Sequence, residues 1–188
     1  MTTLDTSRLH LRPLTADDTD ALLVYRGDPE VCRYLPFTPM DSAEIARRLR
    51  TQWFRTDLVA DGDNITLGAV RRDTGELVGD VVLSLVSREN GNGELGWVFS
   101  PAVAGQRYAT EAAEALADHA FHTVGLRRLV ARLDERNVRS ARVCSRLGMR
   151  LEARLVENEI VRGEPTTELD FAILSREWED RRVGRLPT

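Results

Sequence analysis

One segment in the middle of the chain constrains the fold more than any other, because strand and helix patterns alternate within it. Leu95 to Phe99 form an apolar run typical of a strand. A glycine-containing loop follows, and the apolar spacing then predicts a helix over about 108–123. Gly125 ends this helix before a second apolar strand, from Leu129 to Leu133. The segment therefore predicts a strand, loop, helix and strand unit.

The expected helix has two different faces. Its buried stripe should consist of small and aliphatic residues, namely Ala109, Ala112, Ala113, Leu116 and Ala120. Acidic side chains alternate with that stripe, and we expect Glu111, Glu114 and Asp118 to lie on an opposite, solvated face. The pattern predicts that one side of the helix packs against a sheet.

Helix and strand patterns also alternate over the rest of the chain. Before the central unit, the patterns indicate a strand near 9–11, interrupted helices over 18–56, and strands from residue 65 to the turn at 90–93. After it, they indicate a helix over 138–147 and strands near 151–156 and 169–174, hinged by Gly163 and Pro165. We expect an α/β (α+β) fold with a single domain over 1–188 and a core over about 7–175.

Composition excludes several classes of protein. The chain has 188 residues, a net charge of −4, and 42% hydrophobic and 30% charged residues, which is typical of a globular domain. It contains no apolar run of the ~20 residues that a membrane helix needs, and residues 1–8 contain no apolar signal region. We therefore expect a cytoplasmic protein without membrane or nucleic-acid partners, either a monomer or a homodimer. Cys32 and Cys144 lack metal-ligand spacing, so no metal is expected.

Two short features suggest chemistry. In the first, the strand ending at Phe99 leads through the loop into the helix beginning at Tyr108, and free N–H groups at a helix start can hold a pyrophosphate. A plain strand-to-helix turn would give the same pattern. In the second, Asn137 and Ser140 are spaced three apart at a helix start, where Asn137 could equally be only an N-cap.

Taken together, these features resemble motifs A and B of the GNAT acetyltransferases. The resemblance rests on Glu94-Leu-Gly-Trp, on Tyr108-Ala-Thr-Glu-Ala, and on Asn137-x-x-Ser140 followed by Arg146-Leu-Gly148-Met149. It extends over nearly the whole chain and is greatest to the ribosomal-protein-alanine acetyltransferase type. It implies a mixed, mostly antiparallel sheet that splays between the strands at 95–99 and 129–133, with acetyl-CoA in the split.

The resemblance also implies which residues contact acetyl-CoA. Backbone groups of Val98 and Phe99 would pair with the pantetheine, and Asn137 and Ser140 would approach the thioester. The amides facing the pyrophosphate would be those of Gly105, Gln106, Arg107, Tyr108, Ala109 and Thr110.

The loop departs from the family pattern at two positions. Ala104 stands where glutamine or arginine is usual, and Arg107 stands where glycine is usual. Glycine allows the backbone to approach a phosphate closely, whereas the guanidinium of Arg107 can pair with a phosphate directly.

The reaction that the resemblance implies is acetyl transfer to a primary amine. Such an amine is mostly protonated at neutral pH, so a carboxylate base is needed near the thioester. The candidates are Glu159, favoured slightly, and then Glu94, while Ser140 is the candidate donor to the leaving thiolate. A solvated surface carboxylate is the alternative for each glutamate.

Three functions remain open at this point. The first is acetylation of a protein N-terminal amine or another primary amine. The second is acetylation of a small molecule such as an aminoglycoside, a polyamine or an amino acid. The third is a non-catalytic acyl-CoA-binding domain, which the departures at Ala104 and Arg107 suggest.

Overall fold

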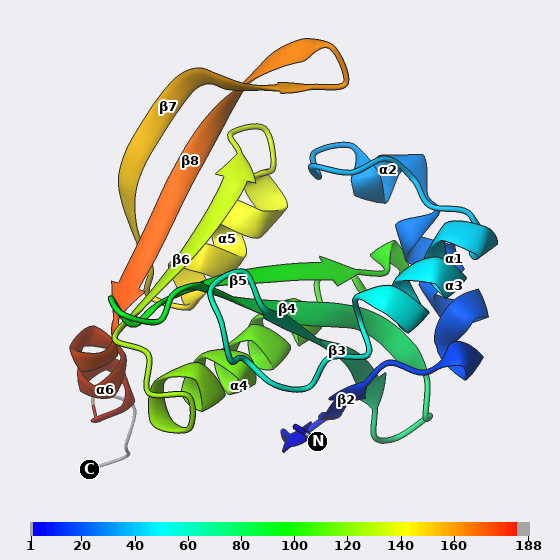
Figure 1. Cartoon of the computed structure of the whole chain (residues 1–188), viewed down its shortest axis with the longest axis horizontal. Coiled ribbons are helices and arrows are strands. Elements are labelled where there is room, and N and C mark those ends of the chain that lie inside the picture. Colours follow the sequence, from blue (N-terminus) through cyan, green and yellow to red (C-terminus); the bar gives the residue numbers. More distant parts are fainter. Residues whose placement is uncertain (1, 184–188) are drawn as a thin grey trace.

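A computed structural model describes residues 2–183 (Figure 1). The strands of the described chain are β1 (Leu4–Asp5), β2 (Leu9–Pro13), β3 (Asn64–Arg71), β4 (Leu77–Ser87), β5 (Asn92–Phe99), β6 (Arg128–Asp134), β7 (Arg150–Val161) and β8 (Glu164–Leu174). The helices are α1 (Thr19–Arg26), α2 (Pro29–Cys32), α3 (Ser42–Thr51), α4 (Tyr108–His122), α5 (Val138–Arg146) and α6 (Ser175–Val183), with short 3-10 turns at Ala16–Asp18 and Pro101–Val103. No helix in this range is long and apolar enough to cross a membrane.

The strands form one sheet in the order β1-β2-β3-β4-β5-β6-β8-β7. Within it, β5 and β6 are parallel, and the other neighbouring strands are antiparallel. The parallel pairing lasts only from Asn92 to Glu94 on β5, opposite residues 128–130 on β6. Beyond it the two strands separate, and Figure 1 shows β6, β7 and β8 turning away from the rest of the sheet. The expected mixed, mostly antiparallel and splayed sheet is confirmed.

Helix α4 covers one face of the sheet with the predicted apolar stripe. Ala112, Ala113, Leu116 and Ala120 are fully or almost fully buried, and Ala109 is half-buried against the same core. Side chains from β2, β3, β4 and β5 complete this core, including Leu11, Leu67, Leu83 and Leu95. The helix therefore fixes the position of the loop that precedes it.

The prediction of a solvated acidic face on α4 is wrong for Glu111 and only partly right for Glu114 and Asp118, whose side chains are 30% and 40% exposed. Glu111 accepts hydrogen bonds from the hydroxyl groups of Thr6 and Ser7 and from Arg8, and its side chain is only 15% exposed. The other two carboxylates are half-buried beneath α6, a helix that the sequence patterns did not predict. Glu114 pairs with Arg181, and Asp118 accepts from the indole of Trp178. The polar face of α4 therefore forms contacts with distant parts of the chain, whereas helix periodicity alone would leave it in solvent.

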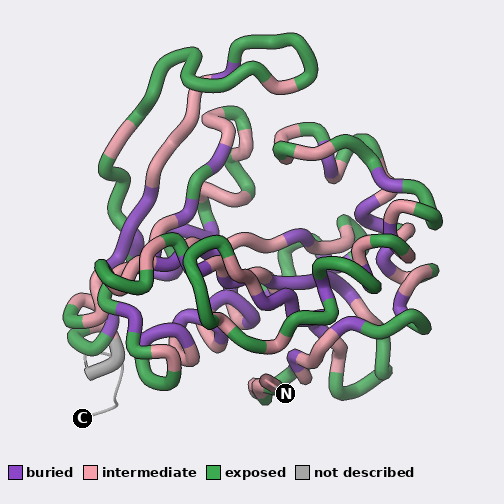
Figure 2. The backbone as a smooth tube through the Cα atoms, viewed as in Figure 1, coloured by how far each residue is buried: buried purple, intermediate pink, exposed green. Residues whose placement is uncertain are grey.

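The last two strands are longer than predicted. β7 extends beyond 151–156 at both ends, whereas β8 begins before 169 and ends at Leu174, as predicted. The two strands form a hairpin, which we call the arm. Figure 2 shows that most of β7 is exposed, which explains why the apolar alternation that marks a half-buried strand is weak there. The expected hinge at Gly163 lies at the tip of the arm.

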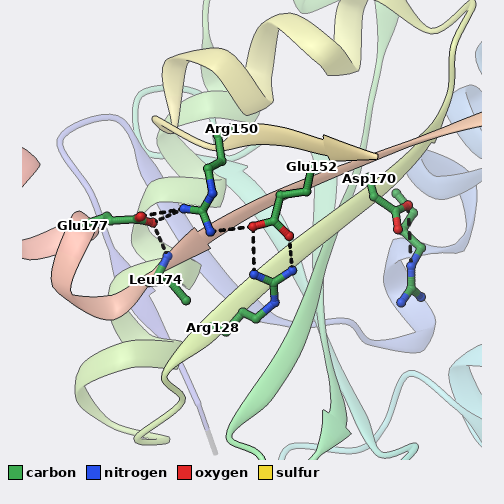
Figure 3. A network of polar contacts seen from close by, with 7 residues as sticks. Arg128, Arg150, Glu152, Asp170, Leu174 and Glu177 are labelled. Atoms are coloured by element: carbon green, nitrogen blue, oxygen red, sulfur yellow. Dashed lines mark hydrogen bonds and ion pairs between the residues drawn. The ribbon is translucent and has the colours of Figure 1, made fainter. Parts of the chain in front are cut away.

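A network of charged side chains joins β6, β7 and α6 at the base of the arm (Figure 3). Arg128 on β6 pairs with Glu152 on β7, and Arg150 pairs with both Glu152 and Glu177 on α6. Glu177 in turn accepts from the backbone N–H of Leu174 at 2.8 Å. The hydrogen bond from Arg128 is the main cause that lowers the pKa of Glu152 to about 2.

Helices α1 and α3 form a second apolar core, which a buried ion pair joins to the sheet. Arg26 on α1 donates to both carboxylate oxygens of Asp80 on β4, at 2.5 and 2.9 Å, and the hydroxyl of Tyr25 donates to the same carboxylate at 2.8 Å. The side chains of Arg26 and Asp80 are 7% and 1% exposed. The rings of Trp53 and Phe37 lie 4.7 and 5.3 Å from the guanidinium. The ion pair therefore has hydrogen bonds and ring contacts that offset its desolvation.

We expect Asp80→Asn to destabilise the protein by about 3–5 kcal/mol, because it leaves the Arg26 guanidinium buried without a counter-charge. The measurement is the free energy of unfolding in urea. The matched control is Asp73→Asn, which breaks the exposed pair with Arg71 and should cost less than about 1 kcal/mol. Equal losses for both variants would contradict the role given to this ion pair.

Candidate active site

The split between β5 and β6 opens into a groove of about 740 Å³. Nine of the ten residues expected to contact acetyl-CoA line it: Val98, Phe99, Gly105, Arg107, Tyr108, Ala109, Thr110, Asn137 and Ser140. Gln106 is not among the lining residues, and its amide donates to the carbonyl of Val103 at 3.3 Å. The groove thus joins the edge of β5, the start of α4 and the start of α5.

The start of α4 provides backbone donors at one end of the groove. The first N–H groups of an α-helix have no partner within the helix, and here they are those of Tyr108, Ala109 and Thr110. The hydroxyl oxygen of Thr110 is buried and has no hydrogen-bond partner in the described chain. A phosphate at this helix start would meet backbone donors, a positive helix dipole and an unpartnered hydroxyl. These groups fit the pyrophosphate of acetyl-CoA.

Arg107 explains why glycine is usual at its position in the family. Its backbone is left-handed, with φ 63° and ψ 17°, and it is the N-cap residue of α4. A residue with a Cβ pays a steric cost in this conformation, whereas glycine does not. The chain therefore places an arginine with a strained backbone among the residues that line the groove.

Arginine side chains surround the groove: Arg33, Arg107, Arg136, Arg139, Arg142 and Arg146. Within residues 2–183, no carboxylate forms an ion pair with Arg107, Arg139, Arg142 or Arg146. Sequence reasoning missed the three arginines of α5, although their spacing of three and four residues places them on one helix face. Their positive charge suits a ligand that carries several phosphates.

Asn137 and Ser140 connect the start of α5 to β5. The side chain of Asn137 accepts from the backbone N–H of Ser140 at 3.1 Å, so Asn137 is an N-cap, as the simpler interpretation held. The Ser140 hydroxyl accepts from the indole N–H of Trp97 at 3.3 Å. Because an indole only donates, the hydroxyl proton of Ser140 is left for another acceptor.

A second cavity, of about 350 Å³, lies on the α1 side of the sheet. We call it the acceptor pocket. It shares six lining residues with the groove, namely Tyr34, Leu35, Trp97, Val98, Asn137 and Ser140. The two spaces therefore meet beside the separated strands.

The acceptor pocket brings together both glutamates that the sequence proposed as bases. Glu94 lies at the last paired position of β5, where the split begins. Burial raises its pKa, Arg132 at 2.9 Å opposes this, and Asp170 and Glu159 raise it further. Glu159 lies on β7 of the arm and is exposed.

The pocket contains further acidic residues that sequence reasoning did not single out. Asp80 and Asp134 have arginine partners, Arg26 and Arg136. Glu168 on β8 accepts a hydrogen bond from the side-chain amide of Asn158, and its pKa is raised by burial and then by neighbouring carboxylates. These residues come from strands far apart in the sequence, so no local motif connects them.

The remaining candidate nucleophiles and ligands lie elsewhere. No histidine lines either cavity, and burial raises the pKa of the Cys144 thiol to about 12. Over residues 2–183, no group of three or more histidine, cysteine, aspartate or glutamate side chains could hold a metal ion.

Comparison with known proteins agrees with this geometry. Residues 8–150 match the family described as the acetyltransferase (GNAT) domain. The chain is 30% identical to the uncharacterized N-acetyltransferase p20 of Bacillus licheniformis, over 95% of this chain and 99% of that protein. An acetyltransferase of the GNAT family from Bacillus anthracis superposes with a TM-score of 0.83 at 26% identity, covering 94% of this chain and 100% of that one.

The chain therefore belongs to the GNAT family and is an acyltransferase, specifically an N-acetyltransferase. The expected subgroup is not established. A protein of Vibrio cholerae described as a "putative ribosomal-protein-serine acetyltransferase" has a TM-score of 0.72 at 22% identity, covering 92% of this chain and 97% of that one. Similarity at that level shows the fold alone.

The left-handed backbone of Arg107 predicts a difference between two substitutions. Arg107→Gly should be more stable than Arg107→Ala by about 1 kcal/mol, because only glycine relieves the steric cost of this conformation. Both substitutions remove the guanidinium, so the difference between their unfolding free energies reports the strain in the backbone alone. Urea unfolding measures the difference. An alanine variant as stable as the glycine variant would show that the backbone at this position is not strained.

Proposed function

We propose that the protein transfers an acetyl group from acetyl-CoA to a primary amine, with a protein N-terminal amine as the first candidate. The observation that carries the proposal is the junction of two cavities beside the split strands. One has phosphate-binding features, and the other is lined by carboxylates. An acyl donor and a cationic amine can therefore approach the same point from opposite sides of the sheet.

The groove residues bind and orient the donor. Acetyl-CoA supplies the activated thioester, and the unpaired edge of β5 beyond Glu94 offers the backbone of Val98 and Phe99 to its pantetheine. The amides at the start of α4 and the arginines of α5 would hold the phosphates.

Glu94 is the general base in this proposal, ahead of Glu159. It lies where β5 and β6 separate, at the inner end of the split, and it is more buried than Glu159. Its raised pKa makes it a stronger acceptor for the proton of an ammonium group. Glu159 would bind the cationic acceptor from the arm.

Ser140 is the proposed hydrogen-bond donor to the leaving thiolate. Its hydroxyl lies at the junction of the two cavities, and the Trp97 indole orients it by donating to one of its lone pairs. The hydroxyl can then donate a hydrogen bond to the sulfur as the carbon–sulfur bond breaks and the amide bond forms, and the released thiolate takes its proton from solvent. The N-cap Asn137 holds Ser140 at the start of α5.

A small polycationic amine is the second candidate acceptor. The acceptor pocket contains Glu159 and Glu168 in addition to three ion-paired carboxylates, those of Asp80, Asp134 and Glu94, so its lining carboxylates outnumber its lining arginines. This excess of negative charge favours an acceptor with a second positive charge near the reacting amine. A polyamine or an aminoglycoside meets that requirement.

The test is release of free CoA thiol from acetyl-CoA in the presence of an alanine-initiated peptide, spermidine or an aminoglycoside. We expect Glu94→Gln to lower kcat/KM by about 10²–10⁴-fold, because the amide cannot accept the proton. In the wild type, the activity should fall as the pH drops through the raised pKa of Glu94, since only the ionised carboxylate is a base. That acidic limb should be absent in the variant.

Glu159→Gln is the matched control, since it removes a carboxylate from the same pocket. We expect it to raise KM for the acceptor more than it lowers kcat. A larger loss of kcat in Glu159→Gln than in Glu94→Gln would reverse the two roles. No thiol release with any of the three acceptors would remove the support for this choice of substrates.

A further inference from the structure

Two segments far apart in the sequence form facing walls of the acceptor pocket. One is the arm, which contributes residues such as Glu159, Val161 and Thr166. The other, which we call the wall segment, is residues 32–37, and it contributes Tyr34, Leu35, Pro36 and Phe37. Figure 1 shows the tip of the arm and the chain after α2 facing each other above the sheet.

Arg162, at the tip of the arm, connects the two walls. Its Nη2 donates to the backbone carbonyls of Cys32, of Leu35 at 3.5 Å and of Phe37 at 3.1 Å. In the described chain, these are the side-chain hydrogen bonds that join the arm to the wall segment. Arginine suits this position because its Nη2 carries two N–H donors, shared here among the three carbonyls, and because the guanidinium stays charged.

The wall segment is also attached to the core on its other side. The Cys32 thiol donates to the carbonyl of Arg26 at 3.3 Å, and the ring of Phe37 lies 5.3 Å from the buried Arg26 guanidinium. The contacts thus continue from the arm, through the wall segment, to the ion pair with Asp80. Holding the wall segment at both sides fixes the width of the acceptor pocket.

Arg162 and Gly163 form the two-residue turn that joins β7 to β8, a position where glycine, asparagine and aspartate are preferred. Arg162 has φ 53°, in the left-handed region where most side chains are disfavoured, and Gly163 follows it with φ 82°. Asparagine, which tolerates this region, would keep the turn. The conformation points to a residue retained for its side chain, because the turn alone would favour glycine or asparagine.

We propose that Arg162 is a positioning residue that clasps the wall segment to the arm and thereby sets the affinity for the amine acceptor. This inference rests on the proposed function of the acceptor pocket. Arg162 does not line the groove, so acetyl-CoA binding should not depend on it. It also does not touch the reacting atoms, so its effect should fall on KM for the acceptor and much less on kcat.

The test compares Arg162→Asn and Arg162→Lys with a control, Glu157→Asn. Asparagine removes the guanidinium and tolerates the left-handed backbone, while lysine keeps one charged donor. Glu157 has φ 50° on the same arm and does not line the pocket. With spermidine and with an alanine-initiated peptide, we expect KM to rise about tenfold in Arg162→Asn, less in Arg162→Lys, and not in Glu157→Asn. The Kd for acetyl-CoA should stay constant in all three.

Hydrogen exchange of the backbone amides of residues 33–35 and 37 gives a readout that needs no acceptor. Exchange there should be roughly tenfold faster in Arg162→Asn than in the wild type and the control. Unchanged exchange would overturn the clasp, and so would an unchanged KM in a variant that still turns over. A wild type that turns over neither probe while exchange still rises would count against the proposed acceptors and not against the clasp.

Discussion

The short parallel pairing of β5 and β6 is the constraint on which the site depends. Three residues of each strand pair, from Asn92 to Glu94 on β5, and then the strands separate. Separation leaves one edge of β5 with unpaired backbone groups, a cost that a bound ligand can recover by hydrogen bonding. The same geometry brings the starts of α4 and α5 to the two sides of the groove, and it places Glu94 at the last paired position of β5, where it lines the acceptor pocket.

Several contacts connect the elements on the two sides of the split. The network of Arg128, Glu152, Arg150 and Glu177 holds β6, β7 and α6 together at the base of the arm, while Trp97 and Ser140 connect the two sides of the split. Surface ion pairs contribute little individually, so the network acts mainly to orient the strands. The buried pair of Arg26 and Asp80 joins α1 to β4, and both of its residues line the acceptor pocket.

The sequence predicted the parts of the fold that have a local signature. Apolar periodicity identified α4 and its buried stripe, and the cap residue Asn137 marked the start of α5. It failed where tertiary contacts decide the outcome, as when Glu111, Glu114 and Asp118 pair with residues far along the chain. The choice of the general base was limited in the same way. The position of Glu159 after the second motif favoured it in the sequence, whereas the burial of Glu94 and its position at the start of the split depend on strand pairing. The clasp by Arg162 joins residues more than a hundred positions apart and has no local signal.

The central claim is that the split holds acetyl-CoA through the helix start, the arginines of α5 and the edge of β5. Calorimetric titration of the purified protein with acetyl-CoA tests it most directly, with desulfo-CoA and an adenine nucleotide titrated alongside. The account predicts saturable binding of acetyl-CoA with micromolar affinity, similar binding of desulfo-CoA, and weaker binding of the nucleotide, which lacks the pantetheine. No binding of acetyl-CoA would contradict the account, because neither acetyl transfer nor the roles of Glu94 and Ser140 could then stand.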